Sequence, residues 1–137
     1  MRTITLIGIA FTLAACGRDS VGPAAAPTTV AGTYNLTTVD GQVLPFTVLD
    51  LGAYQAKLAS ATLNLKADGT YSFQFGIRIE DSGNIRSTSD SDAGLWNASA
   101  NAVTLTSNEG SVTRTGTVAQ GTMTLQSSTL VLGLRKQ

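Results

Sequence analysis

Most of the chain after residue 30 consists of short runs in which apolar and polar residues alternate, each followed by a turn. Alternation with a period of two places one set of side chains on each face of a strand. In the clearest pair of runs, residues 63–67 and 71–79, apolar residues occupy every second position. Asp68-Gly69 lies between them, and an Asp-Gly pair in such a place predicts a two-residue hairpin turn.

Turn-forming residues recur at intervals of roughly ten residues, which is typical of antiparallel strands joined by short hairpins. We therefore expect about eight or nine strands, each with one apolar face. Closing such a sheet into a barrel buries the apolar faces together and removes the exposed edges. The sequence thus predicts an all-β fold, an antiparallel up-and-down β-barrel over residues 31–137. The turns are expected at residues 40–41, 81–84, 97–101, 108–110, 120–121 and 127–128.

Three segments depart from this simple pattern. Residues 43–48 read as a strand interrupted by Pro45, which favours an edge or a bend. In residues 49–59 the apolar positions follow helical spacing, but Gly52 opposes a helix, so we expect a short helical turn or a loop over one barrel end. Residues 87–93 read as a polar loop that follows a weakly specified strand.

Acidic residues in this polar segment partly resemble a calcium-binding loop. Asp90 and Asp92 are followed by Gly94, but a third ligand and the bidentate glutamate of such a loop are missing. A solvated turn is therefore the preferred interpretation, and we expect neither a metal site nor a cofactor. The chain also has no histidine and no Gly-x-Ser-x-Gly motif, so it lacks the usual general base and a recognisable nucleophile. We expect no catalytic activity.

The first residues have the features of a secretory signal. Arg2 precedes a short apolar run over residues 4–13, which is too short to span a membrane, and small residues follow at 14–15. The run Leu13-Ala14-Ala15-Cys16 resembles a bacterial lipobox, in which the chain is cut before the cysteine and the thiol is lipidated. This resemblance implies a signal peptide over residues 1–15, and an acylated Cys16, carrying chains such as palmitate, that anchors the protein in the bilayer.

The expected anchor has consequences for the segments around it. Residues 16–30 contain Pro23, Pro27 and an alanine run, so we expect a flexible tether before a domain over residues 31–137. Gly17 occupies the place where aspartate marks inner-membrane retention in Gram-negative sorting, which favours the outer membrane of the cell envelope. Cys16 is the single cysteine, so no intramolecular disulfide can form.

Charge bears on the possible partners. The chain has 9 basic and 9 acidic residues, a formal net charge of 0. A near-neutral protein has no field to attract nucleic acid, and we expect none as a partner.

The ends of the expected domain resemble a known family. Gly32-Thr33-Tyr34 is similar to the Gly-x-Trp start of lipocalins, with Tyr in place of Trp, and Arg135 stands where that family packs a basic residue over the starting ring. The order of residues 32–36, 39–45, 68–71 and Gly94-x-Trp96 resembles small bacterial lipoproteins with a lipocalin-like domain, over roughly residues 31–136. The resemblance implies a small barrel in the cell envelope.

Two functions remain open at this point. The protein could bind a small apolar ligand inside the barrel, or the same side chains could simply fill the barrel. In the second case it would be a structural or interaction protein that contacts an envelope partner through its outer face or the polar segment 87–93. The lining residues expected for a ligand are Tyr34, Leu65, Phe73, Phe75, Trp96, Leu105 and Leu132.

Overall fold

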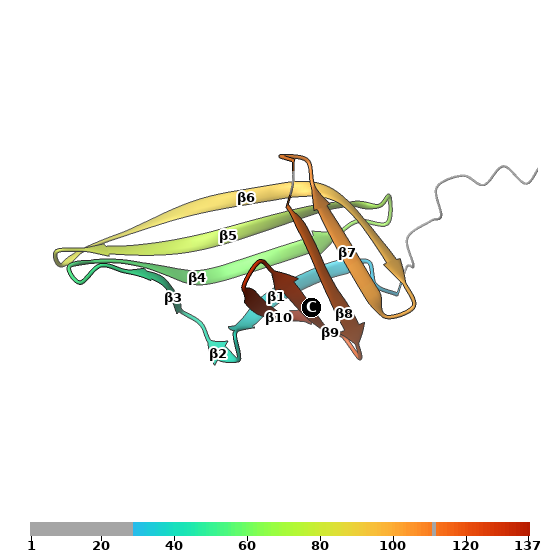
Figure 1. Ribbon diagram of the computed structural model, residues 1–137, viewed down its shortest axis with the longest axis horizontal. Coiled ribbons are helices and arrows are strands. Elements are labelled where there is room, and N and C mark those ends of the chain that lie inside the picture. The colour runs from blue at the N-terminus through green and yellow to red at the C-terminus, as the bar shows by residue number, and fades with distance from the viewer. Residues whose placement is uncertain (1–28, 111) are drawn as a thin grey trace, which may run out of the picture.

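Ten β-strands and the turns between them make up residues 29–110 and 112–137, the part of the chain that the computed structural model describes (Figure 1). Residues of alternating polarity form the strands, as the sequence pattern predicts. The strands are β1 (Gly32–Val39), β2 (Gln42–Val43), β3 (Phe46–Asp50), β4 (Tyr54–Leu65), β5 (Thr70–Asp81), β6 (Asn84–Ser99), β7 (Ala102–Ser107), β8 (Thr113–Ala119), β9 (Thr122–Ser127) and β10 (Leu130–Lys136).

Eight of these strands close into a barrel. Its order is β1-β10-β9-β8-β7-β6-β5-β4, and β4 pairs back with β1, with every pair antiparallel. The closing β1–β4 pair is short and joins residues 32–35 to residues 62–65. The prediction of an all-β, antiparallel up-and-down barrel is confirmed. The extra strands β2 and β3 flank β1 and β4.

A four-stranded arm projects from the barrel (Figure 1). It consists of β3 and the distal parts of the three longest strands: residues 54–60 of β4, 76–81 of β5 and 84–92 of β6. The turns between β3 and β4 and between β5 and β6 form its tip, on the left in Figure 1. The described chain begins, in blue, at the end of the molecule remote from this tip.

The barrel interior is filled by the apolar faces of its strands. Side chains from β1, β4, β5, β6, β7, β9 and β10 converge in one hydrophobic cluster. Burial on this scale is the main stabilising contribution to such a fold. The side chains with no exposed surface are Tyr34, Val39, Leu63, Phe73, Leu105, Met123, Leu125 and Leu134.

Residue pairs ending in glycine reverse the chain at three hairpins. Both residues of Asp40-Gly41, Ser82-Gly83 and Gln120-Gly121 have positive φ, as a two-residue turn of the type favoured in hairpins requires. Glycine adopts such a conformation without steric cost. These pairs fix the β1–β2, β5–β6 and β8–β9 connections.

The turn between β4 and β5 differs from its prediction. The expected hairpin is present, but of the Asp68-Gly69 pair only Gly69 has positive φ. The Gly69 N–H donates to the Lys66 carbonyl at 3.1 Å, and the Asp68 carboxylate accepts from the N–H and hydroxyl of Thr70. The loop therefore includes Ala67, which was expected to lie in the strand, and the two-residue turn was wrong.

Residues 49–59 form no helical turn. β3 ends at Asp50 and β4 begins at Tyr54, so the chain makes a tight reversal between two strands. The Asp50 carboxylate accepts from the Gly52 N–H at 2.9 Å, and Gly52 has positive φ, which stabilises a reversal in place of a helix. The interruption expected at Pro45 is present, since it separates β2 from β3.

The predicted polar loop at residues 87–93, and the solvated turn at 90–94, are also wrong. Both lie within β6, which runs without a break from Asn84 to Ser99. The register with β5 is continuous from Asn84 opposite Asp81 to Leu95 opposite Thr70. The segment has only a weak intrinsic preference for a strand. It forms one because β5 provides hydrogen-bond partners for its backbone along the whole length.

Candidate functional site

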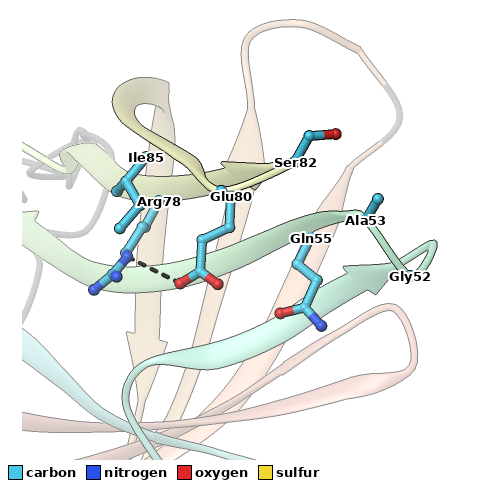
Figure 2. A pocket seen from close by; sticks show the side chains of 8 residues that line it. Gly52, Ala53, Gln55, Arg78, Glu80, Ser82 and Ile85 are labelled. Atoms are coloured by element: carbon cyan, nitrogen blue, oxygen red, sulfur yellow. Dashed lines mark ion pairs between the residues drawn. The ribbon is translucent and has the colours of Figure 1, made fainter.

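A shallow hollow opens on the outer face of the arm near its tip (Figure 2). Its volume is about 360 Å³. The strand registers bring its side chains to one face, because Gln55 lies opposite Glu80 and Glu80 lies opposite Ile85. The hollow is lined by Gly52, Ala53, Gln55, Arg78, Glu80, Ser82, Gly83 and Ile85.

Charges beside this hollow are largely compensated. The Glu80 carboxylate lies 3.1 Å from Lys57 Nζ and 3.1 Å from Arg78 Nε, the second pair being drawn in Figure 2. The Arg78 Nε atom is buried, yet its approach to Glu80 lacks hydrogen-bond geometry, so this N–H has no hydrogen-bond acceptor among the described residues. Partly exposed ion pairs of this kind stabilise a protein only slightly.

The arm also exposes apolar side chains. Val48, Leu49, Leu51 and Ile85 are large hydrophobic residues with high exposure, and all four lie on β3, on the turn that follows it or at the start of β6. The arm thus carries four of the eight exposed large hydrophobic residues of the described chain, and β3 and β6 place them at its two opposite edges. The other exposed large hydrophobic residues of the described chain are Val43, Leu95, Val112 and Val131.

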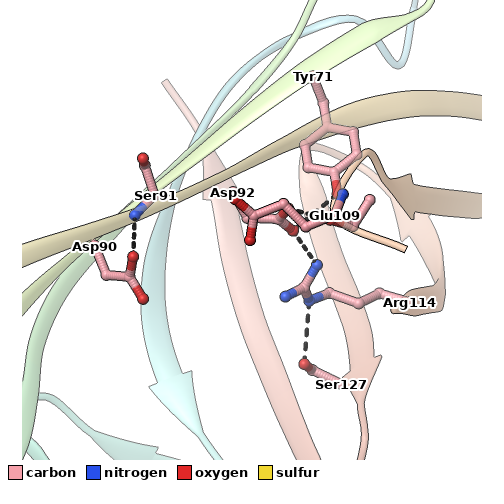
Figure 3. A network of polar contacts seen from close by, with 8 residues as sticks. Tyr71, Asp90, Ser91, Asp92, Glu109, Arg114 and Ser127 are labelled. Atoms are coloured by element: carbon pink, nitrogen blue, oxygen red, sulfur yellow. Dashed lines mark hydrogen bonds and ion pairs between the residues drawn. The ribbon is translucent and has the colours of Figure 1, made fainter. Parts of the chain in front are cut away.

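A second cluster of polar side chains lies where β6 leaves the barrel (Figure 3). The Asp92 carboxylate accepts hydrogen bonds from the Tyr71 hydroxyl at 2.9 Å, the Ser107 hydroxyl at 2.6 Å and an Arg114 Nη atom at 2.5 Å. The Arg114 guanidinium also donates to the Ser127 hydroxyl at 3.1 Å. Its carbon atom lies 5.8 Å from the centroid of the buried Phe73 ring, within range of a cation–π interaction.

The surroundings of this cluster set its protonation. Burial opposes the ionisation of Asp92, but the hydrogen bonds from Ser107, Tyr71 and Arg114 and the Arg114 charge outweigh it and lower the pKa of the carboxyl. Burial, followed by the hydrogen bond to Asp92 and the charge of Asp92, raises the pKa of Tyr71 to about 12. Near neutral pH Asp92 therefore stays ionised and Tyr71 stays protonated, and the hydrogen bonds join β5, β6, β7 and β8 at this point.

No family model, curated protein or solved structure matches the chain.

Two further features of the described residues bear on ligands and membranes. Within them, no group of three or more His, Cys, Asp or Glu side chains is arranged to hold a metal ion. They also contain no helix with the length and hydrophobicity of a transmembrane segment.

The seven residues expected to line a ligand site lie together in the barrel core. Phe75 is half-buried at the base of the arm, and the other six are buried. The Tyr34 hydroxyl donates to the Val30 carbonyl at 2.7 Å, and the Trp96 indole N–H donates to the Lys66 carbonyl at 2.8 Å. None of the seven lines the hollow at the arm tip, so ligand binding by these residues stays a prediction.

The basic residue over the Tyr34 ring is not the expected one. Arg135 is exposed, and Lys136 instead lies over the Tyr34 ring, with Nζ 5.8 Å from the ring centroid. The register explains this difference, since Lys136 is directly opposite Tyr34 and Arg135 therefore points to the other face. Arg114 points inward from β8, toward Asp92.

Sequence reasoning missed that Asp92 and Arg114 both face inward, although the alternation along each strand was a signal for it. Asp92 alternates with Gly94 and the buried Trp96, which places it on the inward face of β6. Arg114 alternates in the same way with Val118 on β8. The predicted signal peptide and the lipidation site Cys16 lie outside the described residues.

Proposed function

We propose that this protein is a lipid-anchored, non-catalytic envelope protein that uses its arm to bind a protein partner, with the filled barrel as a rigid support. The observation that carries this proposal is the exposure of four large apolar side chains on an arm that projects beyond the closed barrel. A barrel alone already closes the sheet. Near its base the arm adds Leu58 to the buried core and packs Phe46 against it, and the rest of the arm extends beyond the core.

The core favours this function over the binding of a small apolar ligand. Large side chains from six barrel strands are completely buried in one cluster, as in small barrels whose interior is packed. The lipocalin-like resemblance is compatible with either outcome, because one fold supports many functions.

The partner is expected to be a protein with an apolar contact surface. Charges beside the tip hollow pair with one another, so the surface has no strong field to select a highly charged molecule. Apolar side chains such as Leu51 and Ile85, which lie beside polar groups, instead resemble the mixed composition of a protein interface.

The anchor would leave the arm accessible. The described chain begins at the end of the molecule remote from the arm tip, so an anchor at Cys16 would be joined to the barrel and not to the arm. A tether over residues 17–29 could extend roughly 40 Å, at about 3.3 Å per residue. The arm could therefore reach a partner without detaching from the bilayer.

Site-specific photocrosslinking in the bacterial envelope tests this function. A photoreactive residue replaces Leu51, which is 68% exposed on the arm, or Leu95, which is 61% exposed on the barrel part of β6 and serves as the matched control. We expect a discrete heteromeric product from position 51 and none from position 95. Leu51→Ser should abolish capture of that same partner by the wild-type arm in a pull-down, while Leu95→Ser should not. Equal capture at both positions, or none at either, would contradict the proposal.

A further inference from the structure

One long edge of the arm has no neighbouring strand in the described chain. Residues 84–92 of β6 pair with β5 on one side, while β6 meets β7 only from Gly94 onward. On this side of β6, the backbone hydrogen bond nearest to residues 84–92 is the one that the Asn108 N–H donates to the Ala93 carbonyl at 2.9 Å. The open stretch therefore runs from Asn84 to Asp92, and its midpoint is Thr88.

The backbone groups that face this open side can be assigned. The Ala93 carbonyl points toward β7, and the Trp96 N–H points the other way, toward the Gly69 carbonyl. Because backbone groups alternate along a strand and the β5 register has no break, the groups of Ile85, Ser87, Ser89 and Ser91 face the open side. An unpaired row of this kind is a template for another strand.

Asp90 occupies part of this edge. Its carboxylate accepts from the Ser91 N–H at 2.8 Å (Figure 3). Beside it lies a shallow hollow of about 310 Å³, lined by Gln74, Ser89, Asp90 and Ser91. An incoming strand would supply a carbonyl to the Ser91 N–H and release the Asp90 carboxylate for another partner.

The open stretch is complementary to itself. When it is paired antiparallel with a second copy about its midpoint, Thr88 lies opposite Thr88 and Arg86 lies opposite Asp90 of the partner subunit. The same operation places Asp90 opposite the partner subunit's Arg86, so the pairing has two opposite-charge pairs. These even-numbered residues fall in the non-hydrogen-bonded positions, where side chains of antiparallel strands approach each other most closely.

We propose that two copies of this protein associate through β6, with residues 84–92 of each chain forming one continuous antiparallel sheet across a two-fold axis at Thr88. Two independent observations agree on this register: the midpoint of the unpaired stretch, and the match between Arg86 and Asp90. The interface is separate from the partner contact expected at Leu51, because Leu51 lies on the opposite, β3 side of the arm sheet, whereas Ile85 belongs to the β6 stretch itself.

Disulfide trapping of the full chain in its membrane tests the register. Thr88→Cys places two thiols opposite each other across the axis, within the separation that a disulfide needs. Ser89→Cys is the matched control, because Ser89 lies opposite Ser87 of the partner subunit and its thiols are out of register. The wild-type chain, whose single cysteine is Cys16, is a second control and measures any disulfide that forms through that residue. After mild oxidation we expect a covalent dimer from Thr88→Cys at a level about tenfold or more above both controls.

Charge-reversal substitutions, made in the Thr88→Cys chain, test the expected pairing of Arg86 with Asp90 of the partner subunit. Arg86→Asp or Asp90→Arg alone places like charges opposite each other, and each should lower the trapped fraction several-fold. The double reversal restores opposite pairs and should restore the dimer. Arg86 and Asp90 are exposed, so these substitutions leave the barrel core untouched.

Other outcomes would overturn the interface. Equal trapping at positions 88 and 89, or a dimer that ignores charge reversal, would exclude this register. A trapped fraction no higher than that of the wild-type chain would exclude β6 pairing. If replacing both Arg86 and Asp90 by Thr increased the trapped fraction, these charges would oppose pairing of the β6 edges and would not direct it.

Discussion

At the scale of single residues, Asp92 is surrounded differently from the residues just before it in the sequence, which are polar and exposed. It lies beside exposed serines and an exposed Asp90, yet its own carboxylate meets three donors. Its side chain and that of Arg114 are only 13% and 11% exposed. At such burial the removal of one partner costs more than a surface ion pair contributes, because the other charge stays buried.

We therefore expect Asp92→Asn to lower the free energy of unfolding by about 3 kcal/mol at pH 7. The pKa of Asp92 is lowered in the folded state, so its stabilisation is present above the unfolded pKa, near 4, and is lost as the pH falls through the folded pKa. The wild-type chain should lose this contribution on acidification below pH 4, and the variant should not. Urea unfolding at pH 7 and at pH 2.5 measures both effects.

Glu109→Gln is the matched control for this substitution. The Glu109 side chain is exposed, and only its backbone N–H contacts the network, at Ser107. We expect its unfolding free energy to stay within about 0.5 kcal/mol of wild type. An Asp92→Asn chain as stable as wild type at pH 7 would show that the pair contributes nothing to the fold.

At the scale of elements, β6 changes its neighbours within a few residues, from an open edge to a barrel strand. Gly94 lies at this change and is buried. A Cβ atom there would overlap the Thr106 carbonyl oxygen of β7, which is backbone and cannot move aside alone. The close approach of these two strands therefore requires glycine.

Gly94→Ala should destabilise the protein by about 2–3 kcal/mol, through overpacking against β7. Gly76→Ala is the control, because neither glycine has a positive φ and a Cβ at Gly76 meets chiefly the hydroxyl of Ser60. We expect it to cost less than about 1 kcal/mol. Thermal unfolding of the two variants measures the difference in stability. Equal losses of stability would mean that β6 and β7 can move apart at Gly94 to accommodate a Cβ atom.

The elements also show which parts of the fold the sequence could predict. Period-two alternation placed Tyr71 and Phe73 in the core, and Asp68-Gly69 located a hairpin, because both signals are local. The length of β6 was not predictable, since its polar residues adopt a strand only when β5 pairs with them. The Asp92–Arg114 pair depends on the register of three strands, and no local pattern encodes such a register.

At the scale of the whole molecule, the two functions that the sequence left open, a ligand cavity and a filled barrel, predict different effects of substitutions in the barrel interior. Phe73 is fully buried, whereas Phe75 is half-buried where the barrel meets the arm, and their ring centroids lie 4.3 Å apart. In a filled barrel, the first ring is a core residue and the second stabilises the base of the arm.

Phe73→Ala should lower the free energy of unfolding by about 3–5 kcal/mol, the range for a packed core aromatic residue. Phe75→Ala should cost clearly less because its ring is only half-buried. Urea unfolding measures both losses. Native mass spectrometry of residues 17–137, which omit Cys16, secreted into the periplasm and purified without detergent, adds the decisive control. A copurified small molecule, together with a small loss in Phe73→Ala, would show a ligand cavity in place of a filled core.

The barrel is closed by the first and last strands of the described chain, and this sets the order in which it can form. β1 pairs with β4 through four residues, but it also pairs with β10, where Tyr34 lies opposite Lys136. While the chain is still being synthesised, β1 has no β10 to join, and the hairpins from β4 to β9 can form only an open sheet. Contacts between such distant residues form late because closing a long loop costs entropy. A chain that stops before residue 130 would therefore leave β1 and β9 as edge strands with unpaired backbone N–H and C=O groups. We expect such a chain to aggregate.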